Sequence, residues 1–333
     1  MKIAIVGCGA LGSYYGAKLC RDGQETHFLL RSDFEMVRRS GVQVRSPEGN
    51  FSTHPKCHRE AGTIGVCDLV IIGLKTTANE QFTRLLPPLI GRHTAVLTLQ
   101  NGLGNEAQLA ALFGAERILG GLCFVCLNRV TPGVIEHIGH GQIILGEFQR
   151  WPEPRTHDIA ARIRHAGVAC KVTDNLERAH WEKLVWNVPF NGLGVAGAAG
   201  YEAVQRGELR ADAQRTGCLT TNLLLDDPRW LTLVRELMHE IILIANALGL
   251  KIPAAAAEEQ VAKTRTMGAY KASTLIDFER GQPLELASLF LEPLRAARRA
   301  GVNTPRLAAL SAVLRNLDPA ADSQHAVERP ANE

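Results

Sequence analysis

The first 130 residues alternate between short apolar runs and segments with helical spacing. Residues 2–6, 25–30, 68–75 and 94–99 each contain a continuous apolar run, which is typical of strands buried on both faces. The segments between them, such as 10–21, repeat apolar residues three and four positions apart, as one face of a helix does. Strands that alternate with helices predict βαβ units and a parallel sheet.

The same patterns predict further elements in this half of the chain. Short strands are expected around Val42 and Phe51, because Pro47-Glu48-Gly49 between them is a hairpin signal. Residues 133–147 predict two short strands around a glycine-rich turn, which would extend the sheet with antiparallel pairs. The other predicted elements are helices over 80–86 and 106–113 and a strand over 118–127.

From about residue 175 onward the pattern is helical almost throughout. The polar segment 318–333 has little periodicity and predicts a disordered tail. The predicted fold class is therefore α/β, with a Rossmann-type parallel-sheet domain over 1–174 followed by an all-α domain over 175–317. The helices expected in the second domain cover 176–195, 211–225, 229–248, 254–264, 270–278 and 284–299.

Composition supports a globular protein with two domains and excludes some partners. The 333 residues are 46% hydrophobic and 21% charged, with a formal net charge of +3. Basic and acidic residues are interleaved without a basic stripe, so we expect no nucleic-acid partner. Asn187, Pro189 and Asn191 interrupt the apolar stretch 184–200, so we expect no membrane span.

Eight cysteines are scattered along the chain, which predicts reduced thiols in a cytoplasmic protein. Cys123 and Cys126 form a CxxC, but it lies in the apolar run GGLCFVCL and no second pair follows at zinc-site spacing. A buried strand explains the pair better than a metal or redox site, and we expect no metal.

Candidate chemistry begins at GCGALG, which follows the first predicted strand and opens the first predicted helix. In this context G-x-G-x-x-G indicates a dinucleotide-binding loop. Gly7 allows a tight turn, Gly9 lets the backbone approach a pyrophosphate, and Gly12 lets helix and strand pack closely. The N–H groups at the helix start then bind the phosphates. The residues expected at the cofactor here are Gly7, Cys8, Gly9, Ala10, Leu11 and Gly12.

Arg31 directly follows the second predicted strand, at the position where an NAD enzyme carries an acid for the ribose 2′-hydroxyl. A planar guanidinium suits a phosphate, so this position favours NADPH/NADP+. Asp33 is the rival observation, but it lies two residues late and we expect it to begin the next helix. Lys75 ends strand 68–75 at the carboxyl edge of the sheet and could reach the cofactor phosphate. Asn101, in LQNGLG, is either a site residue or part of a plain Asn-Gly turn.

The second domain carries Lys183, Asn187 and Asn191 in WEKLVWNVPFNG. This i, i+4, i+8 spacing places the three on one stripe of a largely buried helix, where polar groups need partners. Reduction of a ketone leaves an alkoxide that needs a proton, and a lysine whose pKa burial lowers can supply it. A solvated lysine with two structural asparagines on a helix kinked at Pro189 explains the same pattern, and the spacing alone does not decide between the two.

Three further polar residues lie in ASTLIDFERGQPLE. Ser273 and Asp277 are four apart on a predicted helix, and Glu285 follows Pro283. A glutamate near a buried lysine could orient it or hold a substrate hydroxyl. From the pattern alone, however, helix-surface positions explain all three better.

These motifs together resemble the ketopantoate reductase family from residue 1 to about residue 310. The resemblance implies NADPH-dependent reduction of 2-dehydropantoate to D-pantoate, which is a step towards pantothenate and coenzyme A. It also implies a Rossmann domain and a helical domain with the active site between them. It implies that Lys183 is the general acid and that Glu285 lies near the substrate and this lysine. It assigns the other positions as follows: Asn101, Asn187, Asn191 and Ser273 bind substrate, and the loop from Gly7 to Gly12, Arg31, Lys75 and Asn101 serve the cofactor.

We therefore expect an NADPH-dependent oxidoreductase whose partner is a small 2-keto acid. Two alternatives stay open: a reductase of another 2-keto acid, and a non-catalytic regulator that senses NADP(H). Lys183 with its two asparagines argues against the regulator, which needs no proton donor. The sequence leaves the oligomeric state open, with a homodimer as one option.

Overall fold

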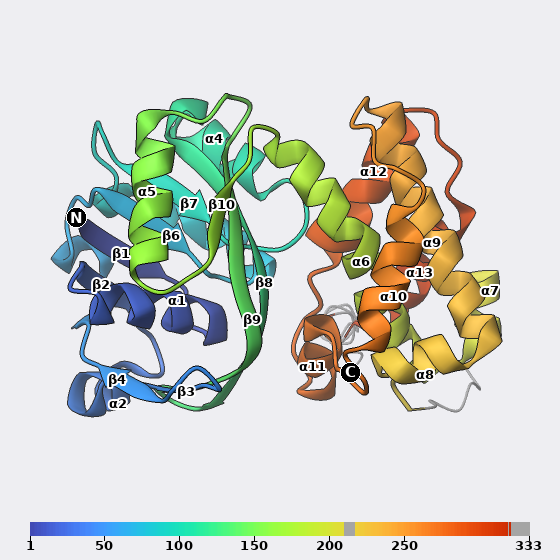
Figure 1. Ribbon diagram of the computed structural model, residues 1–333, viewed down its shortest axis with the longest axis horizontal. Coiled ribbons are helices and arrows are strands. Elements are labelled where there is room, and N and C mark those ends of the chain that lie inside the picture. The colour runs from blue at the N-terminus through green and yellow to red at the C-terminus, as the bar shows by residue number, and fades with distance from the viewer. Residues whose placement is uncertain (210–216, 319, 321–333) are drawn as a thin grey trace, which may run out of the picture. The chain divides into compact units, whose positions relative to one another are not determined.

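The computed structural model describes residues 1–209, 217–318 and 320. The chain divides into two compact units, one from Met1 to Ala179 and the other from His180 onward. The division lies inside a single helix, α6 (Leu176–Ala196) (Figure 1). No helix within the described residues is both long and apolar enough to cross a membrane.

The first unit is built on a sheet whose central strands are parallel, as the sequence predicts. Pairing is parallel between successive members of the order β5-β2-β1-β6-β7-β8. Renumbered along the chain, this is the doubly wound order 3-2-1-4-5-6. The bounds are β1 (Lys2–Val6), β2 (Glu25–Leu29), β5 (Lys56–His58), β6 (Leu69–Ile72), β7 (Ala95–Thr98) and β8 (Ile118–Thr131).

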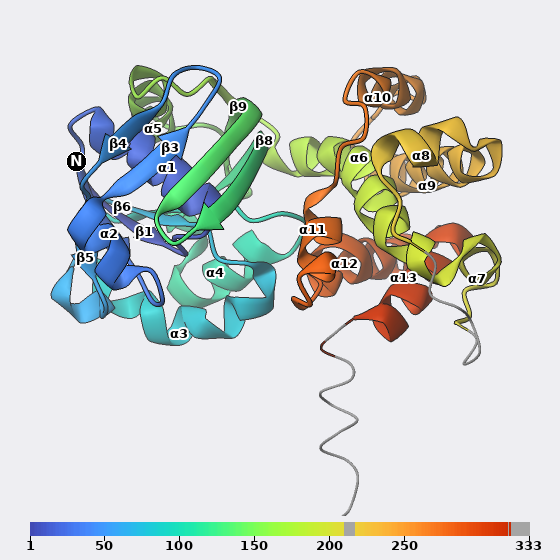
Figure 2. The same ribbon diagram turned by 90° about the horizontal axis from the view of Figure 1, so that it is seen from below.

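Both faces of this sheet are buried, which explains the continuous apolar runs. Ile3 and Ile5 pack into one hydrophobic cluster with residues of α1 (Ala10–Arg21) and α5 (Pro154–His165), while Ala4 and Val6 pack into another with α3 (Phe82–Leu85) and α4 (Asn105–Phe113). Figure 2 shows α1 and α5 on one side of the sheet and α3 and α4 on the other. Alternate residues of each strand therefore serve opposite layers.

An antiparallel extension widens the sheet beyond β8. The predicted two short strands over 133–147 are wrong: β9 (Val134–Glu147) is one long strand, antiparallel to β8. Gly139-His140-Gly141 forms an irregularity within the strand, with φ of 63° at His140, and not a turn between strands. Three shorter strands complete the sheet: β3 (Val42–Arg45), antiparallel β4 (Phe51–Thr53) and β10 (Cys170–Val172).

The connections in this unit bear out the hairpin predicted at Pro47-Glu48-Gly49, which joins β3 and β4. The helix expected over 80–86 is shorter, because a 3₁₀ segment over Thr76–Gln81 precedes α3. The remaining connecting elements are α2 (Phe34–Ser40) and the 3₁₀ turns Ala61–Thr63, Pro87–Leu89 and Ala115–Arg117.

The second unit is helical in its described residues, as predicted. The expected helix over 211–225 lies partly outside the described residues, and its described part is helical only in α8 (Thr221–Asp226). The predicted tail 318–333 also lies outside them, apart from Asp318 and Ala320. Besides α6 the helices are α7 (Tyr201–Arg206), α9 (Pro228–Ala247), α10 (Ala256–Arg265), α11 (Ser273–Glu279), α12 (Glu292–Arg299) and α13 (Pro305–Leu317), with a 3₁₀ turn at Gly197–Ala199 and a π-helical segment at Ala287–Leu291.

Helix α6 is almost wholly buried over its last two turns and continues through Pro189. The indole N–H of Trp186 donates to Thr264 Oγ1 of α10 at 2.9 Å, and the Trp186 and Phe190 rings pack at a tilt of 31° with centroids 5.0 Å apart. These contacts fix the rotation of α6 about its axis within the second unit. The face that carries Lys183, Asn187 and Asn191 is thereby held in one orientation.

Candidate functional site

The glycine loop lies at the point where the strand order reverses. β1 and β6 are neighbours at the middle of the sheet, and the chain leaves them for opposite faces, to α1 and to α3. In open α/β sheets ligands bind outside the carboxyl ends of the strands at this position. Gly7 follows β1 and Gly73 follows β6, so these two loops meet at the expected cofactor edge.

Three glycines allow the loop, the helix and the neighbouring strand to approach closely. Gly7 has φ of 96°, and a Cβ there would lie 2.3 Å from the Leu74 nitrogen. A Cβ on Gly12 would lie 2.2 Å from the Gly7 carbonyl oxygen, and one on Gly73 2.9 Å from the same oxygen. No side chain fits at these points. Gly73 was missed in the sequence analysis, although a glycine directly after the run LVII was a visible signal.

Gly9 differs from its neighbours because a Cβ there would meet no described atom within 4 Å. It precedes α1, which has no side-chain cap and no acidic residue in its first turn. Backbone N–H groups and an open approach therefore coincide at a helix N-terminus, which is the arrangement that binds phosphate. Ala10 and Leu11 begin this helix, and the Cys8 thiol donates to the Ile5 carbonyl at 3.5 Å. Burial raises the pKa of Cys8 well above its ordinary value, so the loop carries no thiolate.

Arg31 is exposed just past β2, whereas Asp33 is buried. Asp33 stands at the N-cap position of α2, as expected, but its carboxylate does not cap that helix. It accepts instead from Arg129 Nη1 at 2.8 and 2.9 Å and from the Gly133 N–H at 3.3 Å. Asp33, the acid considered above as a partner for the ribose hydroxyl of NAD, is thus held by hydrogen bonds from the β8–β9 hairpin.

A network of amides holds the segment that contains Asn101. Gln100 Nε2 donates to Asn79 Oδ1 at 2.8 Å, and Asn79 Nδ2 donates to Asn105 Oδ1 at 3.0 Å. Asn105 Nδ2 in turn donates to the Asn101 carbonyl at 3.1 Å. The loop after β7 is therefore tied to the segment that begins at Lys75, the N-cap residue of the 3₁₀ turn after β6. Sequence reasoning missed this network, because the spacing of single amides does not show which of them meet.

In the second unit the predicted α6 stripe gains a partner from α11. Asn187 and Asn191 are buried, and Asn191 Nδ2 lies 3.5 Å from Asn187 Oδ1. The Ser273 hydroxyl and the Thr274 N–H donate to Asn191 Oδ1 at 3.3 and 3.0 Å. The structure thus brings Asn187, Asn191 and Ser273 together.

Lys183 and Glu285, the two other residues expected at the site in this unit, differ in exposure. Lys183 is half-buried, one helical turn before Asn187 on α6. Glu285 is 4% exposed, so the surface position that the sequence pattern alone favoured for it is wrong. It directly precedes the helical segment whose π-helical turn covers Ala287–Leu291, and such turns are frequent at functional sites.

The structure also describes the cysteines and the groups that could bind a metal. All eight lie in the described part of the chain, and none forms a disulfide. Cys123 and Cys126 are buried on β8, as predicted. Among the described residues no cluster of three or more histidine, cysteine or carboxylate side chains could hold a metal ion.

Comparison with known proteins tests the resemblance over both units. The family model described as "Ketopantoate reductase PanE/ApbA" matches residues 3–150, and its C-terminal counterpart matches residues 213–318. A 2-dehydropantoate 2-reductase from a Nostoc species is 37% identical over 323 residues, covering 95% of each chain. The crystal structure of 2-dehydropantoate 2-reductase from Geobacter metallireducens is 46% identical, with a TM-score of 0.86 and coverage of 95% of this chain and 99% of that one.

A more distant structure shares the fold alone. A ternary structure of D-mandelate dehydrogenase with NADH and anilino(oxo)acetate is 19% identical, with a TM-score of 0.82 over 97% of this chain and 99% of that one. The N-terminal and C-terminal family models thus match this chain in order along the sequence, and the glycine loop lies within the N-terminal match. This chain belongs to the ketopantoate reductase family of oxidoreductases.

Proposed function

We propose that this protein reduces 2-dehydropantoate to D-pantoate with NADPH, a step towards pantothenate and coenzyme A. One observation carries the proposal: a relative named 2-dehydropantoate 2-reductase aligns with 37% identity over 95% of both chains. The absence of any disulfide among the eight cysteines supports a reducing compartment, and we propose a cytoplasmic location.

The first unit fits the adenine-nucleotide half of NADPH. The loop from Gly7 to Gly12 would hold the pyrophosphate, since Gly9 leaves space and α1 presents uncapped N–H groups. Arg31 and Lys75, each just past a parallel strand, would hold the ribose 2′-phosphate. When bound, NADPH supplies the hydride that adds to the ketone carbon of the substrate.

In the second unit Lys183 is the proposed general acid. As the ketone carbon gains hydride, its oxygen takes a proton from the Lys183 ammonium, which later regains one from solvent. Asn187, Asn191 and Ser273 bind the substrate oxygens. The hydrogen bonds from Ser273 and Thr274 fix the Asn191 amide, so its orientation is set before substrate arrives. Glu285 holds the lysine or a substrate hydroxyl. Asn101, in the first unit, is assigned to the cofactor and to a substrate oxygen.

A second candidate substrate is another small 2-keto acid. The D-mandelate dehydrogenase structure shares this fold, so the fold leaves open which group stands beside the ketone and carboxylate. Pocket residues that read that group decide between the candidates.

An assay of NADPH oxidation by the purified chain tests the proposal. Absorbance at about 340 nm reports NADPH consumption with 2-dehydropantoate, pyruvate, 2-oxoisovalerate and phenylglyoxylate, each over a range of concentrations. We expect kcat/KM for 2-dehydropantoate to exceed the others by about tenfold or more. A larger value for another keto acid supports the second candidate. NADPH binding without oxidation by any of the four contradicts the enzymatic proposal.

A further inference from the structure

Asp33 is a buried carboxylate whose two oxygens are both engaged. It is 4% exposed and lies two residues after Arg31, past the carboxyl end of β2. Arg129 Nη1 reaches Oδ1 and Oδ2 at 2.8 and 2.9 Å, the Ser32 hydroxyl donates to Oδ1 at 2.9 Å, and the Gly133 N–H donates to Oδ2 at 3.3 Å. Arg129 lies near the end of β8 and Gly133 in the turn before β9. The β8–β9 hairpin therefore fixes the position of this acid.

The charge around the end of β2 is strongly biased towards arginine. Glu35, the other acid of the segment 31–40, pairs with Arg38 at 3.0 Å and with Arg59 at 2.9 Å. Hydrogen bonds first from Arg59 and then from Arg38 lower the pKa of Glu35, so it stays ionised and paired. With both acids compensated, the positive charge of Arg31 is unopposed for a phosphate.

An unpaired carboxylate at this position has two effects on a dinucleotide. It repels the 2′-phosphate of NADPH, and it accepts a hydrogen bond from the 2′-hydroxyl of NADH. A carboxylate that accepts four hydrogen bonds and faces a guanidinium does neither. The ion pair between Arg129 and Asp33 is thus placed to determine which dinucleotide the chain prefers.

We infer that Arg129 determines cofactor specificity through Asp33, by compensating its charge and holding it away from the ribose. This inference rests on the proposed function for the identity of the cofactor, and it adds a residue on a strand remote in sequence from the β2 end. Arg129 is a positioning residue here and does not itself bind the dinucleotide.

The test compares Arg129→Gln, Asp33→Asn and the double variant with the unaltered chain. Dissociation constants for NADPH and NADH come from quenching of intrinsic fluorescence, without keto acid, and kcat/KM follows for each cofactor. We expect Arg129→Gln to lower the NADPH-to-NADH preference about tenfold, because Asp33 becomes an uncompensated charge. Asp33→Asn and the double variant keep the original preference within about twofold, because they carry no charge to compensate.

A matched control is Arg155→Gln. Arg155 is a half-exposed arginine that pairs with the fully buried Glu147 in the same unit, with Nε 3.1 Å from Oε1. Its loss should destabilise the chain in a similar way and leave the cofactor preference unchanged. Circular dichroism and thermal unfolding of every variant separate folding from specificity.

Several results would overturn the inference. Arg129→Gln could weaken both dinucleotides by the same factor, or the double variant could fail to restore the preference. If Arg129→Gln does not fold, Asp33→Asn and the double variant still test the inference, because both lack the Asp33 charge. A lower NADPH-to-NADH preference in the double variant than in Asp33→Asn would show that Arg129 acts directly on the phosphate, which contradicts the inference. If the unaltered chain binds neither dinucleotide, the proposed cofactor is wrong. If the unaltered chain binds NADPH and Arg129→Gln keeps the same NADPH-to-NADH preference, only the role of Arg129 is wrong.

Discussion

Gly9 and Gly12 belong to one motif but answer to different physical demands. Gly9 is needed only if something must approach the backbone, because a Cβ there would meet no described atom within 4 Å. Gly12 is needed by the fold itself, because a Cβ there would lie 2.2 Å from the Gly7 carbonyl oxygen. The two positions therefore separate ligand binding from packing.

We predict that Gly9→Ala leaves the unfolding temperature unchanged and weakens NADPH binding by about tenfold or more, because the methyl group occupies the space that a pyrophosphate needs. Gly12→Ala lowers the free energy of unfolding by about 1–3 kcal/mol through overpacking. Thermal unfolding and a fluorescence titration with NADPH measure both quantities. Unchanged NADPH affinity in a folded Gly9→Ala chain would show that the loop holds no dinucleotide.

At this scale the sequence predicts residues whose role is local and misses those whose role depends on a distant partner. Gly7, Gly9 and Gly12 were predictable because their spacing reflects one turn between a strand and a helix. The burial of Asp33 was not, because its partner Arg129 lies 96 positions away. The same holds for Thr274, whose N–H donates to Asn191 across 83 positions.

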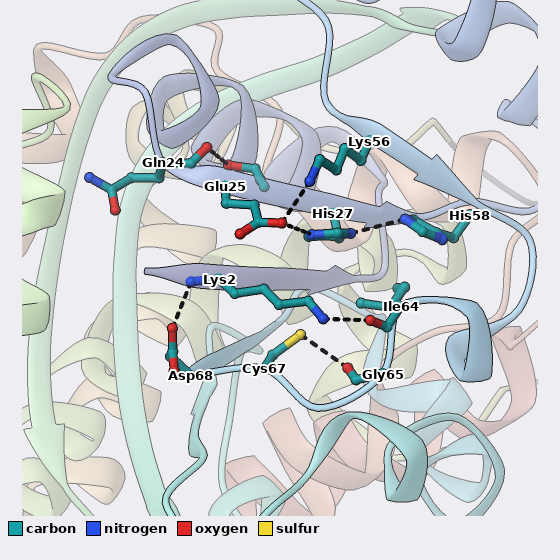
Figure 3. A network of polar contacts seen from close by, with 11 residues as sticks. Lys2, Gln24, Glu25, His27, Lys56, His58, Ile64, Gly65, Cys67 and Asp68 are labelled. Atoms are coloured by element: carbon teal, nitrogen blue, oxygen red, sulfur yellow. Dashed lines mark hydrogen bonds and ion pairs between the residues drawn. The ribbon is translucent and has the colours of Figure 1, made fainter.

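Strands β2 and β5 are linked by a contact between two histidine side chains. His27 Nδ1 and His58 Nε2 are 2.9 Å apart, His27 Nε2 is 3.1 Å from Glu25 Oε1, and Lys56 Nζ also reaches Glu25 (Figure 3). A hydrogen bond between two imidazoles requires at least one to be neutral. Burial is the main cause that lowers the pKa of both histidines below the ordinary 6.5. The charges of Lys56 and Lys2 lower the pKa of His27 further, although Glu25 opposes this shift. For His58 the further causes are the charges of His27, Lys2 and Lys56.

We predict that this pair makes the free energy of unfolding fall as pH drops below about 6.5. Because the pKa values are lower in the folded chain, the unfolded chain binds more protons at acidic pH, and protonation favours unfolding. Urea unfolding at about pH 7.5 and about pH 5.5 measures the change. His58→Gln, which keeps a polar side chain but cannot be protonated, should reduce it, whereas Gln at the exposed His93 should not. Equal pH dependence in all three chains contradicts the prediction.

Elements were predictable where one period dominated and were misjudged where it was interrupted. The central strands and most helices of the second unit follow directly from continuous apolar runs and 3.6-residue spacing. In β9, Gly139 and Gly141 suggested a turn, but pairing with β8 continues on both sides of the irregularity at His140. The helix expected over 284–299 contains a π-helical turn at Ala287–Leu291 that the spacing of apolar residues did not predict.

At the scale of the whole molecule, the proposed roles divide between the two units, apart from Asn101 of the first unit, which is assigned to both cofactor and substrate. The residues assigned to the cofactor all lie before Ala179, whereas Lys183, Asn187, Asn191, Ser273 and Glu285 all lie after it. If each unit performs its own part, a change in one should alter one kinetic quantity and spare the other. The family resemblance implies this division, because it assigns the cofactor loop and Arg31 to the first unit and the general acid Lys183 to the second, and it stays a prediction.

We predict that Lys183→Ala lowers kcat by about 10² or more while the dissociation constant for NADPH stays unchanged, because only the proton donor is lost. Arg31→Ala should do the reverse, raising the dissociation constant for NADPH far more than that for NADH and sparing kcat at saturating cofactor. Steady-state kinetics with 2-dehydropantoate and a fluorescence titration with each dinucleotide measure these effects, and Lys263→Ala, at an exposed position of α10, is the matched control. Near-normal turnover in Lys183→Ala removes this lysine as the acid, and equal losses of NADPH and NADH in Arg31→Ala remove the phosphate contact. If both variants instead lose cofactor affinity and turnover together, the roles are not separable by unit, and the assignment of proton transfer to the second unit fails.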